Sequence, residues 1–313
     1  MKKLLISGLG GSLFPYLHYK LIRDGFDPVY VDSNADLKYV YPEFNFYPAP
    51  MVSDPDYAIL IREIFEKESI EGYVPLIDEE IILAHQIAED YGHILVFAPT
   101  KEFTKLCLDK YLLMNELIKS EISINPTYIG SEFDWQIDAP LFIKPNVGRG
   151  SRGIKRIDNP EQLSAYYKLE DYSAEETIIQ NYIPGVEYTV GVLTNHKNKV
   201  LSISPKRVLK KKGITLLSVT ENNQIIENLA YEINDKFYPQ GPFNIQLFIR
   251  DDGSPAIFEI NPRFSTTLVQ SYEAGLSEIS LFLNHLEDED PLVSFGKEGV
   301  YLSRHWENRF YAR

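Results

Sequence analysis

Residues 244–263 read NIQLFIRDDGSPAIFEINPR, and this stretch decides the fold. An Asp-Gly pair between two apolar runs is typical of a β-hairpin. With DDGS as the loop, the register places Gln246 opposite Glu259 and Asn244 opposite Asn261. Because side chains alternate between the two faces of a strand, Gln246, Glu259 and Asn261 lie on one face. The hairpin therefore presents one carboxylate and two amides together.

The same register makes predictions for the rest of the hairpin. Arg250 faces Pro255 beside the turn, while Phe258 and Ile260 point to the opposite face, into a core. The carboxylate and amide oxygens suit Mg²⁺, which keeps few protein ligands and takes the others from water and phosphates. Taken alone, the alternative is a solvated polar face of a sheet.

A second segment, PLFIKPNVGRGSRG at 140–153, combines a strand with a glycine-rich basic loop. Lys144 ends the strand, and Gly148, Gly150 and Gly153 free the loop that follows. Such a loop can lay backbone N–H groups on phosphate oxygens. The alternative is a flexible basic turn on the surface.

The composition limits the partners of the chain. The 31 Lys and Arg residues are outnumbered by 45 Asp and Glu residues, which gives a net charge of -14. A chain this acidic is a poor general binder of nucleic acid or anionic membranes, so a phosphate site must be a local basic cluster. The single cysteine, Cys107, cannot form an internal disulfide, which predicts a cytoplasmic location.

The order of the predicted elements divides the 313 residues into three parts. The first, 1–100, alternates strands and helices and predicts a doubly wound parallel sheet. The second, 101–185, opens with a helix over 104–120 and continues into a small domain. The third, 186–313, reads as antiparallel strands.

Five elements, in this order, resemble the ATP-grasp superfamily, nearest to carbamoyl-phosphate synthetase large subunits and related carboxylate–amine ligases. They are Asp109-Lys110, FIKPNVGRGSRGI, IIQNYIPGVEYTV, PKR and NIQLF…FEINPR. The first hundred residues are similar to the small α/β domain that precedes the grasp in that family. The resemblance implies an N-terminal doubly wound α/β domain, a small lid domain and a C-terminal antiparallel-sheet domain.

The resemblance also implies a role for individual residues. Lys110 and Lys144 are similar to the paired lysines that hold ATP phosphates, and Arg263 to the arginine near the γ-phosphate. Arg207 stands where the family often has a basic residue facing substrate, so Arg263, Lys144 and Arg207 are the implied catalytic residues. The other implied site residues are the closing loop Gly148, Gly150, Ser151 and Gly153; the adenine-reading hinge Gln180, Asn181, Tyr182 and Ile183; the ribose-binding Glu187; and the metal-binding trio Gln246, Glu259 and Asn261.

The activity implied by the resemblance is an ATP-dependent ligase. Such an enzyme uses Mg²⁺, for which Mn²⁺ can substitute, to activate a small carboxylate as an acyl phosphate for attack by an amine. Two alternatives stay open: activation of bicarbonate to carboxyphosphate, and a non-catalytic ATP-binding subunit. No nucleic-acid or membrane partner is expected, and a homodimer is the commonest assembly.

Three segments leave questions that the resemblance does not answer. After NPR, relatives often have a glycine pair, whereas this chain has 264–267 FSTT, which leaves the substrate class open. The lysines at 210–212 are expected in a solvated loop. The acidic run 78–80 either attracts a cationic amine or stabilises a helix start through the helix dipole.

Overall fold

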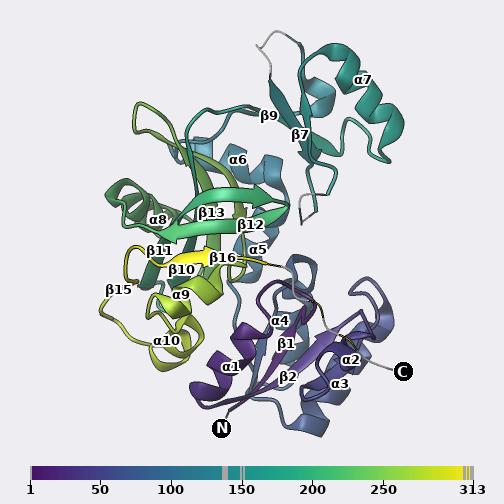
Figure 1. The fold of residues 1–313 in the computed structure, drawn as a ribbon, viewed down its shortest axis with the longest axis vertical. Helices are drawn as coiled ribbons and strands as arrows, with labels where there is room; N and C mark the ends of the chain where they lie inside the picture. The colour runs from purple at the N-terminus through teal and green to yellow at the C-terminus, as the bar shows by residue number, and fades with distance from the viewer. Residues whose placement is uncertain are drawn as a thin grey trace.

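The computed structural model describes residues 2–135, 140–148, 150, 152–305, 308 and 310, and these residues form three sheets. Figure 1 shows a small sheet at one end of the molecule, a large sheet in the middle and a parallel sheet at the other end. No helix among the described residues combines the length and apolar character that a membrane crossing requires.

The N-terminal sheet is parallel, and helices cover both of its faces. Its strands, in the order β3-β2-β1-β4-β5, are β1 (Lys2–Ser7), β2 (Phe26–Asp32), β3 (Asn45–Pro48), β4 (Gly72–Val74) and β5 (Leu95–Val96). Its helices are α1 (Tyr16–Arg23), α2 (Leu37–Val40), α3 (Pro55–Glu68), the short 3-10 helix η1 (Asp78–Glu80) and α4 (Ile81–Glu89). The doubly wound parallel sheet expected from the sequence is confirmed.

The large sheet is antiparallel apart from one short strand. It runs β14-β13-β10-β11-β12-β16, with β10 (Val186–Thr194), β11 (Val200–Lys212), β12 (Ile214–Thr220), β13 (Pro242–Ile249), β14 (Pro255–Asn261) and β16 (Tyr301–Ser303); β15 (Ser294–Phe295) pairs with β11 in parallel. Helices α5 (Lys101–Leu108), α6 (Lys110–Lys119) and α8 (Gln224–Phe237) share a core with one face of this sheet. Helices α9 (Leu268–Glu273) and α10 (Glu278–Asn284) pack with the N-terminal sheet.

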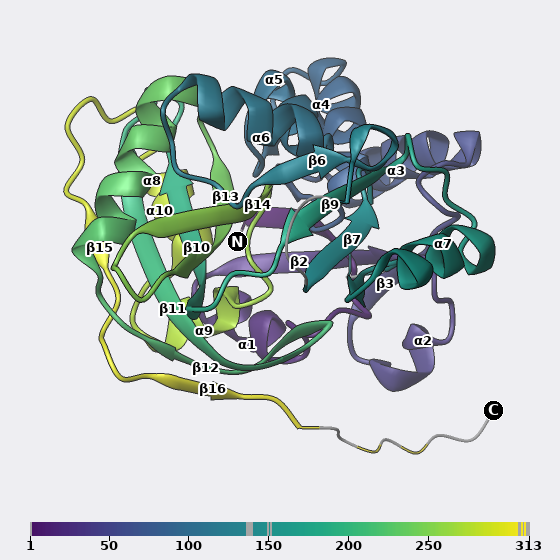
Figure 2. The ribbon, with the colours of Figure 1, turned by 90° about the horizontal axis from the view of Figure 1, so that it is seen from above.

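The small sheet is antiparallel and carries one helix. Its order is β6-β9-β7-β8, with β6 (Thr127–Ile129), β7 (Leu141–Pro145), β8 (Lys155–Ile157) and β9 (Thr177–Asn181), and its helices are α7 (Pro160–Leu169) and the short 3-10 helix η2 (Gly130–Glu132). Figure 2 shows α7 on the outer side of this sheet, away from the large sheet. The fold class expected from the sequence is thus confirmed in its three parts.

The single helix expected over 104–120 is wrong, because the chain breaks at Asp109. This residue has an extended backbone, with φ −100° and ψ 101°, and its side chain caps α6 by accepting from Leu112 N at 2.9 Å. The same carboxylate oxygen accepts from Asn146 Nδ2 at 2.9 Å. The break makes Lys110 the first residue of a new helix and buries it beside the glycine-rich loop.

The hairpin register is confirmed at the end that carries the polar side chains and is wrong beside the turn. Gln246 pairs with Glu259, and Asn244 with Asn261, but Ile249 rather than Arg250 faces Pro255. A β-bulge absorbs the difference of one residue. The register therefore shifts within the hairpin without moving its polar face.

The bulge also overturns the expected direction of Phe258. This residue lies on the strand between Ile257, which pairs with Leu247, and Glu259. Its ring lines a pocket instead of entering the core. The extra residue of a bulge breaks the simple alternation of faces, which explains the difference.

Candidate active site

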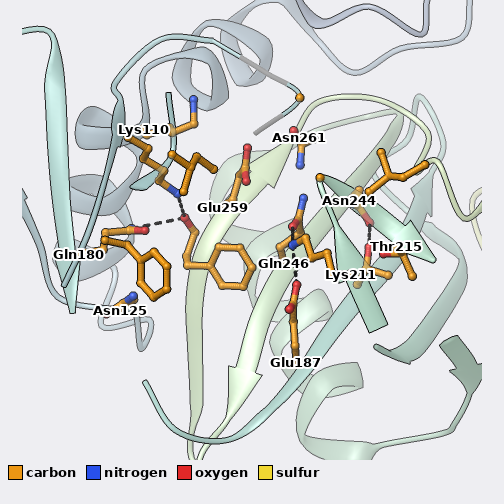
Figure 3. Close-up of a pocket in the computed structure, with 18 of the residues that line it drawn as sticks. Lys110, Asn125, Gln180, Glu187, Lys211, Thr215, Asn244, Gln246, Glu259 and Asn261 are labelled. Carbon is orange, nitrogen blue, oxygen red and sulfur yellow. Dashed lines mark hydrogen bonds and ion pairs between the residues drawn. The ribbon is translucent and has the colours of Figure 1, made fainter. Parts of the chain in front are cut away.

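A cavity of about 780 Å³ lies between the small sheet and the large sheet. Figure 3 shows Lys110 and Gln180 on one side of it and Glu187, Gln246 and Lys211 on another. The predicted site residues that line it are Lys110, Lys144, Gly148, Gly150, Gln180, Asn181, Tyr182, Ile183, Glu187, Gln246, Glu259, Asn261 and Arg263. The structure therefore gathers residues from 110 to 263 into one cavity.

Two adjacent rows of paired residues contribute five side chains to the floor of the cavity: Thr189, Asn244, Gln246, Glu259 and Asn261. The first row runs across four strands as Lys206, Thr189, Gln246 and Glu259, and the second as Ser204, Gly191, Asn244 and Asn261. Paired residues of a sheet point to the same face, so each row presents its side chains together.

Lys144 is held by the carbonyl that the bulge exposes. Its Nζ donates to Phe258 O at 3.1 Å, and Gln180 Nε2 donates to the same oxygen at 3.4 Å. Burial lowers the pKa of Lys144 to about 8; the Glu259 charge opposes this shift, whereas Lys110 and Lys211 add to it. The bulge thus joins the small sheet to the large one through a buried ammonium.

Lys110 contacts the glycine-rich loop directly. Its Nζ donates to Gly148 O at 2.7 Å and to Asn146 O at 3.2 Å. The side chain of Asn146 accepts from Tyr111 N at 2.8 Å, which fixes the loop to the start of α6. A phosphate at this place would have to compete with two carbonyl oxygens for the ammonium.

Lys211 is a pocket residue that sequence reasoning missed. The expected loop over 210–212 is wrong, because β11 continues through Lys212. The Lys211 Nζ lies 2.5 Å from Glu187 Oε1 and donates to Gln246 Oε1 at 3.1 Å. A run of three lysines gives no sign of which one faces inward, so only the strand pairing identifies it.

The oxygen donors of Gln246, Glu259 and Asn261 fit a hard divalent cation. They lie in the two rows of the floor and line the cavity together. Among the described residues, no group of three or more His, Cys, Asp or Glu side chains could hold a metal ion. A cation held by this trio, with one carboxylate, would complete its coordination with water and phosphate oxygens, as Mg²⁺ commonly does.

Arg263 is fixed from the N-terminal part of the chain. Its Nε lies 2.5 Å from Asp78 Oδ1, and its Nη1 donates to Phe264 O at 3.1 Å. The acidic run at 78–80 forms η1, and its first member, Asp78, pairs with this arginine. Neither reading of the acidic run in the sequence included this pair.

Arg207 lies apart from the cavity. It pairs across the sheet with Tyr188, on the face opposite the two rows, and its Nε lies 2.8 Å from Glu221 Oε2. Its neighbour Lys206 points to the cavity face but is fully buried. The expectation that Arg207 faces substrate is not met here, because the alternation of β11 turns Lys206 inward instead.

The predicted hinge and loop residues divide between the cavity wall and its supports. Two hinge amides are used within the protein: Asn181 N donates to Pro126 O at 3.4 Å, and Tyr182 N to Pro140 O at 3.1 Å. Gly153, outside the cavity lining, supports the loop, because its carbonyl accepts from Tyr166 Oη at 2.9 Å. Ser151 lies outside the described residues.

The cavity has the opposite charge to the chain as a whole. Its basic lining residues are Lys110, Lys144, Arg152, Lys211 and Arg263, and its acidic ones are Glu187 and Glu259. The whole chain carries a net charge of -14. Low-dielectric walls focus such a local excess of charge, so the cavity is suited to a polyanionic ligand.

Comparisons with known proteins identify relatives of this arrangement. A family model described as "ATP-grasp in the biosynthetic pathway with Ter operon" matches residues 173–302. A D-alanine–D-alanine ligase from Christiangramia forsetii is 25% identical over 172 residues, 49% of this chain and 52% of that protein. The arginine-specific carbamoyl phosphate synthase large chain of Bacillus subtilis is 24% identical over 278 residues, 82% of this chain and 26% of that protein. The chain thus spans about half or less of these relatives.

Solved structures share the fold over nearly the whole chain. An L-amino acid ligase from Bacillus licheniformis has a TM-score of 0.70 at 18% identity, covering 93% of this chain and 75% of that one. An N5-carboxyaminoimidazole synthetase from Staphylococcus aureus, complexed with ADP, has a TM-score of 0.72 at 17% identity, with 93% and 79% covered.

Proposed function

The chain has the ATP-grasp fold, and from this premise we propose that it is an ATP-dependent ligase. In this proposal the γ-phosphoryl group of ATP is transferred to a small carboxylate, and an amine then attacks the acyl phosphate. The products are an amide, ADP and phosphate. The cationic cavity with the trio Gln246, Glu259 and Asn261 on its floor is the observation that carries the proposal.

The chemistry requires activation of the carboxylate, because oxide is a very poor leaving group and phosphate is a good one. Phosphoryl transfer needs positioning and charge neutralisation more than covalent help. We assign Lys110 and Lys144 to the phosphates and Arg263 to the transferred group. We assign Glu187, which lines the cavity, to the ribose hydroxyls; in this role it would have to give up its ion pair with Lys211.

The metal site has a limited role in this proposal. Mg²⁺, when bound by Gln246, Glu259 and Asn261, would neutralise phosphate charge during the transfer. The residues themselves supply an oxygen-rich face beside the buried ammonium of Lys144, whose charge interacts with Glu259. Mn²⁺ is expected to substitute, because it accepts the same oxygen donors.

The loop at 148–153 is proposed to exclude water from the acyl phosphate, which hydrolyses readily. Gly153 is the anchor of this loop. A Cβ there would lie 2.9 Å from both Pro145 Cγ and Tyr172 Cε2, and its φ of +67° favours glycine.

We also propose that the chain divides into three parts, 1–100, 101–185 and 186–313. One sheet falls in each range, although α5 and α6, from the second range, pack on the large sheet of the third. A cytoplasmic location and a homodimer are proposals too.

The test is phosphate release from MgATP across a panel of amino acids, singly and in pairs, other small carboxylates with amines, and bicarbonate with ammonia. Release that needs one carboxylate and one amine supports the ligase. Release with bicarbonate alone favours carboxyphosphate formation instead. ATP binding without release in any well favours a non-catalytic ATP-binding subunit.

Glu259→Ala tests the proposed floor of the site. We expect turnover to be lost, because the substitution removes the one carboxylate of the trio. Asp252→Asn, in the exposed turn of the same hairpin, is the matched control and should keep wild-type turnover. Activity that survives Glu259→Ala would contradict the metal assignment.

A further inference from the structure

We propose that Asp78 positions Arg263, so that the N-terminal part of the chain completes the phosphate site. The inference rests on the proposed function, since it concerns the arginine assigned there to the γ-phosphate. A second, small cavity lies beside the main one, and Asp78 lines it together with Lys110, Glu259 and Asn261. Asp78 does not line the main cavity, whereas its partner Arg263 does, so in this proposal Asp78 acts through Arg263.

Both side chains of the Asp78–Arg263 ion pair are largely buried. The side chain of Asp78 is 7% exposed and that of Arg263 is 14% exposed, and the Nε–Oδ1 distance is 2.5 Å. Breaking a buried pair by removing one partner leaves the other charge uncompensated. Arg263 is therefore held by a charge that it cannot easily exchange for water.

The contacts of the guanidinium group divide between its edges. Nε forms an ion pair with Asp78 Oδ1 without a hydrogen bond, and Nη1 donates to the carbonyl of Phe264. No described residue forms a hydrogen bond with Nη2, and Arg263 lines the cavity. This arrangement orients the planar group and leaves one N–H edge for an anion.

The segment that carries Asp78 is fixed by a buried carboxylate two residues later. Glu80 is fully buried, and its oxygens accept from the hydroxyls of Ser7, Tyr57 and Tyr73. The Tyr57 hydroxyl donates at 2.6 Å and the Tyr73 hydroxyl at 3.1 Å.

The donors around Glu80 come from β1, α3 and β4, at the end of the parallel sheet that faces the cavity. Ser7 Oγ also accepts from Leu76 N at 2.8 Å, and Ile77 N donates to Glu80 Oε1 at 3.3 Å. The segment from Leu76 to Glu80 is therefore tied to the N-terminal sheet on both sides of Asp78. A rigid anchor of this kind is what a positioning residue needs.

A competing role for Asp78 predicts the opposite effect. If the carboxylate acts as a brake that occupies Arg263, its removal frees the arginine and strengthens binding of the γ-phosphate. If it positions Arg263, its removal weakens that contact. Loss of a negative charge alone would also raise affinity for ATP over ADP, because ATP carries the greater charge. The sign of the change separates the explanations.

The experiment measures the dissociation constants of MgATP and MgADP by calorimetry, which needs no knowledge of the acceptor substrate. The proteins are wild type, Asp78→Asn, Arg263→Ala and the double variant. We expect Asp78→Asn and Arg263→Ala each to reduce the preference for ATP over ADP, on the order of tenfold for a charged phosphate contact. The double variant should match Arg263→Ala, because Asp78 acts through that residue.

Two further variants separate positioning from general destabilisation. Asp24→Asn removes the charge of another N-terminal carboxylate, which accepts from Ser280 Oγ of α10 at 3.3 Å, and it should keep the wild-type preference. Asp78→Glu keeps the charge and should therefore keep part of the wild-type preference for ATP. This variant tests the inference if Asp78→Asn folds poorly.

An unchanged or increased preference in Asp78→Asn overturns the inference, and so does a wild-type preference near unity. A wild-type chain that binds neither nucleotide contradicts the proposed function itself.

Discussion

At the residue scale, Lys144 shows how packing sets the charge of the site. Burial lowers its pKa to about 8, with help from Lys110 and Lys211 and against the pull of Glu259. A lysine is charged below its pKa, so the ammonium is present at neutral pH and is lost as the pH rises through about 8. Phosphate binding favours the charged form.

The affinity for MgATP should therefore fall as the pH rises. We expect the dissociation constant to increase about tenfold between roughly pH 7 and pH 9, because binding requires a proton that the free protein loses. Lys144→Arg keeps its charge over this range and should flatten the profile. A flat profile in the wild type would show that Lys144 does not bind the anion as an ammonium.

At the element scale, the break between α5 and α6 places Lys110. Asp109 caps α6 and also accepts from the side chain of Asn146. Asp109→Ala removes both contacts, so we expect it to lower the free energy of unfolding by about 1–2 kcal/mol. Urea denaturation measures the change. Asp109→Asn keeps an acceptor for the cap and should cost less; equal losses in both variants would contradict the capping role.

The sequence predicted part of the hairpin of β13 and β14 correctly and part of it wrongly. The turn at 251–254 predicted the pairing of Gln246 with Glu259, and the structure has it. The alternation of side chains between the two faces misplaced Phe258, because a bulge adds one residue that periodicity does not reveal. The carbonyl of Phe258, which holds Lys144, could not be foreseen for the same reason.

The end of the long strand β11 is a second element that the sequence predicted wrongly. Its segment 206–212 is rich in lysine, which is typical of solvated loops. Pairing with β10 and β12 nevertheless makes it a strand, in which Lys211 lines the cavity, Lys206 is buried and Arg207 lies on the opposite face from Lys206. Which side chain of a basic run faces inward depends on register, and register is set by partners far along the chain.

At the scale of the whole molecule, the N-terminal part and the large sheet meet with little space between them. A Cβ on Gly241 would lie 2.4 Å from Ala98 O and 2.6 Å from Pro99 N. Close by, Thr100 N donates to Pro239 O at 2.8 Å. Glycine at 241 lets the end of the parallel sheet approach the start of β13.

Gly241→Ala should therefore force these parts apart. We expect a loss of about 1–3 kcal/mol in the free energy of unfolding, as for other overpacked positions, measured in urea. Ala98 offers only backbone atoms at the contact, so no side-chain rotation relieves it. A denaturation midpoint equal to that of the wild type would show that the strand ends move apart without lowering the free energy of unfolding.

The basic cavity within an acidic chain affects how a nucleotide arrives. At a distance, a body of net charge -14 repels anions, and only near the opening does the lysine-rich interior attract them. The repulsion grows with the charge of the approaching anion, and free ATP is more highly charged than its magnesium complex. If the proposed function holds, we therefore expect the metal-complexed nucleotide to associate faster than the bare one, before it contacts any residue inside the cavity.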